Sequence, residues 1–145
     1  MRRVPCDAQY IEALGYAVYN FATLEFNVAY IIERLEPGYL QEYISNEKTA
    51  GDVAKDLAQA KQRAEAQGHT AAAELRDIYN AFVDLKNRRN KLLHANPTTA
   101  PRGAQQLHYL ALSIAWDLDA VRQSATDFAA AAEKANSLLY GVLRA

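Results

Sequence analysis

The sequence has few of the residues that staple or bend small proteins, with one cysteine, four prolines and six glycines in 145 residues. The lone Cys6 excludes an intrachain disulfide framework and fits a reducing compartment. A chain of this length buries roughly 70% of the surface that it exposes when unfolded, so it needs no metal or disulfide to hold a core. We expect a single domain over residues 1–145.

An excess of charge of one sign is also missing. The 16 basic and 17 acidic residues give a formal net charge of −1, so the whole molecule does not attract nucleic acid over a long range. No run approaches the roughly 20 apolar residues of a membrane span, and the first residues lack the apolar region of a secretory signal. We therefore expect a cytoplasmic protein without a membrane partner, in which any RNA contact is local.

Residues that favour helices are abundant. Half of the chain is hydrophobic and alanine recurs throughout, which predicts an all-α fold, an antiparallel bundle of four main helices. Capping residues and breaks place these helices at about residues 7–36, 49–68, 70–96 and 117–143. Residues 105–113 alternate like a strand, but a single short strand would lack a partner, so helix and extended loop stay open for them.

Two of the predicted helices carry a charged residue inside an apolar stripe. In the third helix the charged residue is Arg89, and the stripe comprises Leu75, Ile78, Phe82, Leu85, Arg89 and Leu92. In the first helix it is Glu25, and the stripe comprises Ile11, Leu14, Val18, Phe21, Glu25, Val28, Ile32 and Leu35. Because buried charges are usually paired, we expect Glu25 to orient Arg89. The alternative is that Glu25 lies at the edge of its stripe.

Each of the three histidines has an arginine close upstream, so that pairing alone discriminates nothing. Arg89 and His94 differ from the other pairs because they share one predicted helix, with Asn90 and His94 four residues apart on one face. In a purely structural alternative, Arg89 bridges two helices through Glu25 and His94 contacts the carbonyls at the helix end. The neighbouring cations would then form only a solvated surface; they are Lys86, Arg88 and Lys91.

With these residues the chain resembles the HEPN family, small helical-bundle proteins marked by an arginine, four to six residues and a histidine. Residues 89–94, Arg-Asn-Lys-Leu-Leu-His, match the four-residue form. The resemblance implies a homodimer in which the motifs of two chains face one cleft and cleave RNA without a metal or other cofactor. HEPN toxins that are silenced by tyrosine modification carry a tyrosine two residues after the histidine, where this chain has Asn96. A protein antitoxin or regulator is a further candidate partner.

The side chains suit this chemistry. An imidazole ordinarily titrates near pH 6.5, so His94 can accept a proton from a ribose 2′-hydroxyl or donate one to the 5′-oxygen. Arg89 can stabilise the charge that develops on phosphorus, and Asn90 can hydrogen-bond the substrate or fix the imidazole. The products would be 2′,3′-cyclic phosphate and 5′-hydroxyl ends. A local basic rim for RNA would come from Lys86, Arg88, Lys91 and Arg102.

The leading hypothesis is therefore a dimeric, metal-independent endoribonuclease of HEPN type that acts as a toxin or anti-phage effector. The alternative is a non-catalytic helical module that binds a nucleotide or a protein. A histidine phosphotransfer domain is a weaker third hypothesis, because it needs an exposed histidine in the middle of a helix and His94 lies near a helix end.

Overall fold

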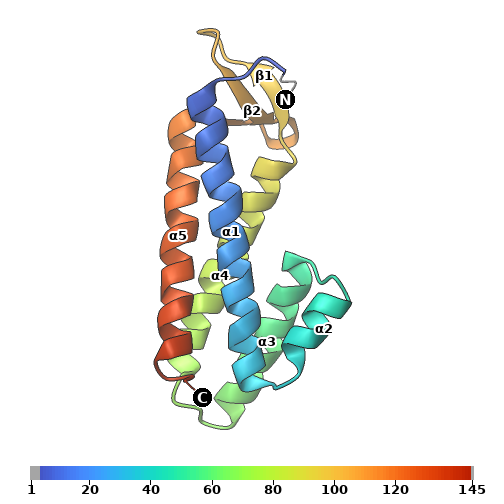
Figure 1. Cartoon of the computed structure of the whole chain (residues 1–145), viewed down its shortest axis with the longest axis vertical. Helices are drawn as coiled ribbons and strands as arrows, with labels where there is room; N and C mark the ends of the chain where they lie inside the picture. The colour runs from blue at the N-terminus through green and yellow to red at the C-terminus, as the bar shows by residue number, and fades with distance from the viewer. Residues whose placement is uncertain (1–3, 145) are drawn as a thin grey trace.

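The computed structural model describes residues 4–144 and is mostly helical (Figure 1). Its helices are α1 (Ala8–Leu35), α2 (Tyr39–Ser45), α3 (Ala50–Ala66), α4 (Ala72–Leu93) and α5 (Leu118–Tyr140). Between α4 and α5 lie β1 (Asn96–Thr99), β2 (Gln105–Tyr109), a 3-10 turn (Leu110–Leu112) and β3 (Ile114–Trp116). The prediction of a helical protein holds for most of the chain, but the bundle of four main helices is not confirmed.

The two longest helices, α1 and α5, run side by side in the same direction (Figure 1). The side chain of Asn20 donates to the backbone carbonyl of Ala125 at 3.0 Å, and that of Asn27 donates to Ala132 at 3.1 Å. Both bonds join residues 105 apart in the chain, as a parallel pair requires. The expected antiparallel order fails here because α4 returns to the end where α1 starts, and the chain crosses that end before entering α5 (Figure 1).

The connection between α4 and α5 is a three-stranded antiparallel sheet of order β1-β2-β3, where a loop and an ambiguous segment were predicted. Pro97 lies in β1, an edge strand, where a missing N–H costs no ladder hydrogen bond. The central strand β2 therefore has partners on both sides. Tyr10 joins the sheet to α1, because its hydroxyl donates to Trp116 O at 2.6 Å and accepts from Leu107 N at 2.9 Å.

The core of the helical layer is built around three phenylalanines. The ring of Phe21 in α1 lies 5.9 Å from Phe82 in α4 and 5.2 Å from Phe128 in α5, measured between centroids. The predicted stripe of α4 is confirmed at its apolar positions, all of them buried: Leu75, Ile78, Phe82, Leu85 and Leu92. These contacts fix the face of α4 that carries Arg89.

The predicted stripe of α1 is correct only in its second half. Phe21, Val28 and Ile32 are buried, whereas Ile11 and Val18 are 48% and 45% exposed. In the first half the helix instead buries Tyr10, Ala13 and Ala17. Ala13 lines the groove between α1 and α5, and α3 lies beside only the second half of α1 (Figure 1). An apolar face of α1 is therefore open to solvent beside the C-terminal half of α4.

Most helix starts follow the predicted caps. Asp7 accepts from Gln9 N at 3.0 Å, Asp117 accepts from Ala120 N at 2.8 Å, and Thr49 forms a capping box with Asp52. The predicted cap of the third helix, Thr70, is wrong, because α4 starts two residues later, at Ala72. The N-cap residue is Ala71, which has no capping side chain, and its backbone N–H donates to Nδ1 of His69 at 3.0 Å.

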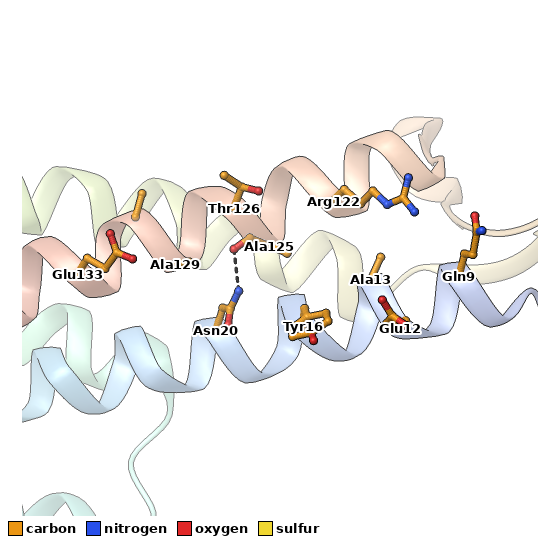
Figure 2. Close-up of a pocket in the computed structure, with 11 residues that line it drawn as sticks. Gln9, Glu12, Ala13, Tyr16, Asn20, Arg122, Ala125, Thr126, Ala129 and Glu133 are labelled. Atoms are coloured by element: carbon orange, nitrogen blue, oxygen red, sulfur yellow. Dashed lines mark hydrogen bonds between the residues drawn. The ribbon is translucent and has the colours of Figure 1, made fainter.

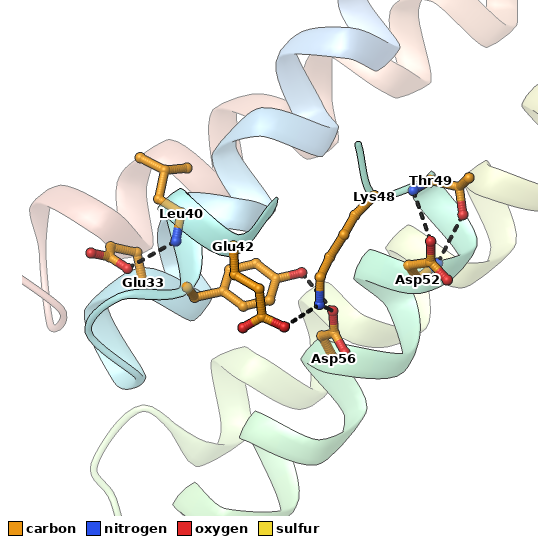
Figure 3. A network of polar contacts seen from close by, with 8 residues as sticks. Glu33, Leu40, Glu42, Lys48, Thr49, Asp52 and Asp56 are labelled. Carbon is orange, nitrogen blue, oxygen red and sulfur yellow. Dashed lines mark hydrogen bonds and ion pairs between the residues drawn. The ribbon is translucent and has the colours of Figure 1, made fainter. Parts of the chain in front are cut away.

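Polar contacts hold the short helix α2 against α1 and α3 (Figure 3). Lys48 Nζ lies 2.7 Å from a carboxylate oxygen of Asp56 and 3.1 Å from one of Glu42, and it sits over the ring of Tyr39. The Tyr39 hydroxyl also donates to Asp56, at 2.8 Å. The Glu33 carboxylate of α1 accepts from the backbone at the start of α2. The α2 segment thus depends on ionised carboxylates and neutral phenols.

We expect the contacts of α2 to weaken at alkaline pH. Burial, and then the hydrogen bond to Glu25, raise the pKa of Tyr43 to about 12, and burial raises the pKa of Tyr39 above its usual value. A pKa that is raised by folding stabilises the fold fully below the unfolded value, roughly 10 for tyrosine, and this contribution is lost as pH rises through the folded value. The free energy of unfolding should therefore fall between about pH 10 and pH 12.

Urea unfolding across this pH range, with tyrosinate absorbance as a second signal, measures the effect. The variant Tyr43→Phe should lose part of the pH dependence, whereas Tyr140→Phe, at a side chain 63% exposed, should retain all of it. Equal pH profiles for Tyr43→Phe and the unchanged chain would contradict the assignment.

Candidate active site

The predicted motif occupies the last turns of α4, directly before the sheet. His94 is the C-cap residue, and its backbone N–H donates to Asn90 O at 3.0 Å. The helix ends here because Asn96 and Pro97 enter the extended strand β1, and a residue before proline disfavours helical geometry. The side chain of His94 is exposed, whereas that of Asn90 is half-buried.

Arg89 lies in the apolar stripe of α4, as predicted, and packs against α1. Its guanidinium carbon is 4.5 Å from the centroid of the Phe21 ring, a cation–π contact worth about 0.5–2 kcal/mol. Its Nε atom is buried and has no hydrogen-bond partner among residues 4–144. A buried donor without a partner is uncommon in proteins and costly, so the position of Arg89 calls for an explanation beyond packing.

The expected pairing of Glu25 with Arg89 is wrong. Glu25 is half-buried on α1, and its carboxylate accepts a hydrogen bond from the Tyr43 hydroxyl at 2.7 Å. Among residues 4–144, Arg89 forms no ion pair with any carboxylate. The reason is that α2, whose packing the stripe pattern could not predict, brings a tyrosine to Glu25 first. An aromatic ring, and not a carboxylate, supports Arg89.

The three cations proposed to contact RNA differ in their surroundings. Arg88 pairs with Asp127 of α5 and lies 3.8 Å from Asp84, and this contact holds the pKa of Asp127 below its usual value. Arg88 therefore joins α4 to α5, contrary to the expectation that it faces RNA. Lys86 and Lys91 are half-buried and form no ion pair within the described part of the chain.

A single chain does not bring Arg89 and His94 onto one face. An α-helix turns by about 100° per residue, so two residues five apart differ by about 140° around the axis. Arg89 points toward α1, and His94 lies on the outer side at the end of the helix. Asn90 is one turn before His94, on the same side. The motif thus divides into a half-buried cation, Arg89, and a polar pair on another face, of which His94 is exposed and Asn90 half-buried.

The sheet carries a histidine, His108, that was not among the predicted site residues. His108 belongs to one of the two Arg–His pairs that the sequence did not distinguish, and it lies in the central strand β2, directly opposite Asn96. Directly opposed residues of an antiparallel pair lie on the same face, with Cβ atoms about 5 Å apart. Asn96 follows His94 by two residues. The alternation of Leu107 and Tyr109 in the sequence indicates a strand. That assignment was left open because Pro97 disfavours a strand over residues 96–99, so no partner strand was predicted.

A groove without any residue of the motif lies between α1 and α5 (Figure 2). It has a volume of about 530 Å³, and alanines of both helices line it, among them Ala13, Ala125 and Ala129. Glu12, Arg122 and Glu133 lie along its sides (Figure 2). No histidine lines this groove, so it is separate from the motif.

Two further findings concern the described residues as a whole. Within residues 4–144, no three or more histidine, cysteine, aspartate or glutamate side chains are grouped so that they could hold a metal ion. Over the same residues, no helix combines the length and the apolar character that a membrane span needs.

Comparisons with models of known protein families, with curated proteins and with solved structures give no match to this chain.

Proposed function

We propose that this chain is a metal-independent endoribonuclease of the HEPN type, with Arg89 and His94 as its catalytic residues. The observation that carries the proposal is the state of Arg89, a cation inside an apolar stripe that rests on the Phe21 ring and, among residues 4–144, forms no ion pair with a carboxylate. An arginine that no carboxylate neutralises keeps its charge for a phosphate. The Phe21 ring holds the guanidinium in place without neutralising it.

The proposed reaction is transfer of the phosphodiester to the neighbouring 2′-oxygen. His94 of one chain removes the 2′-hydroxyl proton as that oxygen attacks phosphorus, and Arg89 stabilises the charge that accumulates on the phosphoryl oxygens. The bond from phosphorus to the 5′-oxygen then breaks, and a second imidazole protonates the leaving oxygen. Asn90, one turn before His94, orients the imidazole or the substrate. The products are 2′,3′-cyclic phosphate and 5′-hydroxyl ends.

The second imidazole would come from a second copy of the chain. Arg89 and His94 differ by about 140° around α4, so one chain does not direct both side chains at the same point. Two copies that face each other could place Arg89 of one chain beside His94 of the other. Three large apolar side chains on these two helices are exposed: Ile11 (48%) and Val18 (45%) on α1, and Leu93 (45%) on α4. Leu93 directly precedes His94, and α1 is the helix on which Arg89 packs. Large apolar side chains that stay exposed on a helix are candidates for an interaction surface. We propose that this face forms the homodimer.

The cellular role that we propose is that of a toxin or an anti-phage effector, by analogy with the family that the motif resembles. Lys86 and Lys91 would supply the local positive charge for RNA, since Arg88 is engaged with Asp127. A protein antitoxin or regulator remains a proposed partner. Asn96, in place of a tyrosine, argues against control by tyrosine modification.

Incubation of RNA with the purified chain in excess chelator tests the activity. We expect cleavage with 2′,3′-cyclic phosphate and 5′-hydroxyl ends, which end-specific labelling of the fragments detects. Sedimentation should show that the active species is a dimer. Absence of cleavage from a strictly monomeric protein would contradict the proposal, as would cleavage that requires an added divalent ion.

A non-catalytic module that binds a nucleotide or protein is the second candidate function. The contact between Arg89 and Phe21 favours it, because a cation stacked on a core ring also serves packing alone. Under this alternative, Arg89→Ala lowers the melting temperature and the wild-type chain leaves RNA intact.

A further inference from the structure

A second groove runs between α4 and α5. Acidic side chains line it, whereas the motif at the end of α4 is basic. One part of it has a volume of about 650 Å³ and a neighbouring part about 230 Å³. The two parts share four lining residues and are therefore continuous; these are Asp77, Ile78, Ala130 and Lys134. Along α5 the lining extends from Asp127 to Leu138, a length of about 16 Å at the rise of an α-helix, and it continues beyond the helix to Gly141 and Val142. The groove is elongated, which suits an extended or helical segment better than a compact ligand.

The floor of the groove is apolar. It consists of side chains from three helices that are at least 90% buried and show only an edge to the groove: Leu24, Ile78, Leu85 and Leu138. At its end, Val142 is 51% exposed. An apolar floor of this length matches the side chains that a helix presents at positions i, i+3, i+4 and i+7.

The sides of the groove are acidic. Five carboxylates line it, namely Glu74, Asp77, Asp84, Asp127 and Glu133. The only cation that lines it within residues 4–144 is Lys134. Arg88 does not line the groove, but it pairs with two of the lining carboxylates, Asp127 and Asp84. Glu74, Asp77 and Glu133 are exposed and form no ion pair within that range. This surplus of negative charge contrasts with the near-neutral chain as a whole.

From these observations we infer that the groove between α4 and α5 is the docking surface for a basic amphipathic helix of a partner protein. The apolar side of that helix covers the floor, and its lysines and arginines face Glu74, Asp77 and Glu133. The same charges repel RNA, so this surface is separate in place and in chemistry from the motif at the end of α4. The inference does not rest on the proposed ribonuclease function.

The test uses a synthetic peptide of about 18 residues, long enough to form a helix, with leucines at i, i+3, i+4 and i+7 and lysines elsewhere. Its binding to the full chain is measured by fluorescence anisotropy at low and at raised ionic strength. A peptide of the same composition in scrambled order lacks the apolar face, and a third peptide carries glutamates in place of the lysines. We expect saturable binding of the first peptide only, weakened by salt.

The groove variant is Glu74→Gln with Asp77→Asn, and the control variant is Asp119→Asn with Glu12→Gln. The pairs are matched, because Glu74 and Asp119 each lie in the first turn of a helix and Asp77 and Glu12 are exposed within one. We expect the groove variant to bind the peptide about tenfold more weakly, since it loses two exposed ion pairs that each contribute modestly, and the control to bind as the unchanged chain does.

Three outcomes would overturn the inference. One is equal binding by the groove and control variants, and another is equal binding of the scrambled peptide. In the third, the chain self-associates through this groove. Sedimentation would then show association of the unchanged chain and of the control variant, but not of the groove variant. A second copy, and not a basic partner, would then be the occupant.

Discussion

Replacement of His94 by alanine should lower RNA cleavage by roughly 10²–10⁴-fold, the usual contribution of general acid–base catalysis. The side chain of His94 is exposed and makes no hydrogen bond or ion pair within residues 4–144, so its removal should leave the free energy of unfolding within about 0.5 kcal/mol. Initial cleavage rates at a fixed dimer concentration, with urea unfolding of the same samples, measure both quantities.

His69 provides a matched control with the opposite pattern. Its Nδ1 accepts a hydrogen bond from Ala71 N in the turn just before α4, so His69→Ala should cost about 0.5–1.5 kcal/mol of stability while cleavage by the folded protein is unchanged. Cleavage that persists in His94→Ala at the rate of the unchanged chain would sink the assignment of His94.

Arg89 should behave differently from both histidines. Arg89→Ala removes the charge proposed to stabilise the transition state and also the packing on Phe21, so it should reduce cleavage and stability together. Arg89→Lys keeps the charge but loses the planar fork of donors, and should recover stability more than activity. Full activity in Arg89→Ala would show that the arginine is structural.

The largest effect on stability is expected at Phe21. Its ring contacts Phe82 and Phe128 and lies under the guanidinium of Arg89, so Phe21→Ala should cost about 3–5 kcal/mol of unfolding free energy. Phe26→Ala on the same helix is the comparison, because that ring is 42% exposed and should cost markedly less. Urea unfolding at neutral pH measures both variants.

Phe21→Leu separates the packing role of the ring from its support of Arg89. Leucine retains much of the buried apolar volume but offers no aromatic face to the guanidinium. We therefore expect a moderate loss of stability with a disproportionate loss of cleavage. Loss of stability without any change in cleavage would show that the ring does not position Arg89.

The helices and the stripe of α4 could be predicted from the sequence because they depend on local periodicity. Arg89 stood out for the same reason, since it occupies a position where the 3.6-residue period demands an apolar side chain. The shift of the α1 stripe toward Ala13 and Ala17 could not be predicted, because it depends on which helices cover each end of α1. Periodicity identifies an apolar face, but only packing decides whether that face is covered.

The partners of the charged residues also depend on tertiary packing. Glu25 was assigned to Arg89 because buried charges are usually paired, but Tyr43 of α2 contacts Glu25 instead. Arg88 was assigned to RNA, and Asp127, which lies 39 positions further along the chain, engages it. His108 was set aside because its strand depends on pairing with Asn96 and Ala115, neither of which is adjacent in sequence.

The position of Pro97 limits how copies of this protein can associate. A sheet with a free edge can add a strand from another chain, but proline supplies no N–H for such pairing, and the opposite edge strand, β3, has three residues. Both edges are therefore poor templates for strand addition. Two chains that meet near His94 must join through helix surfaces, and the small sheet fixes the end of α4 without propagating into a fibre.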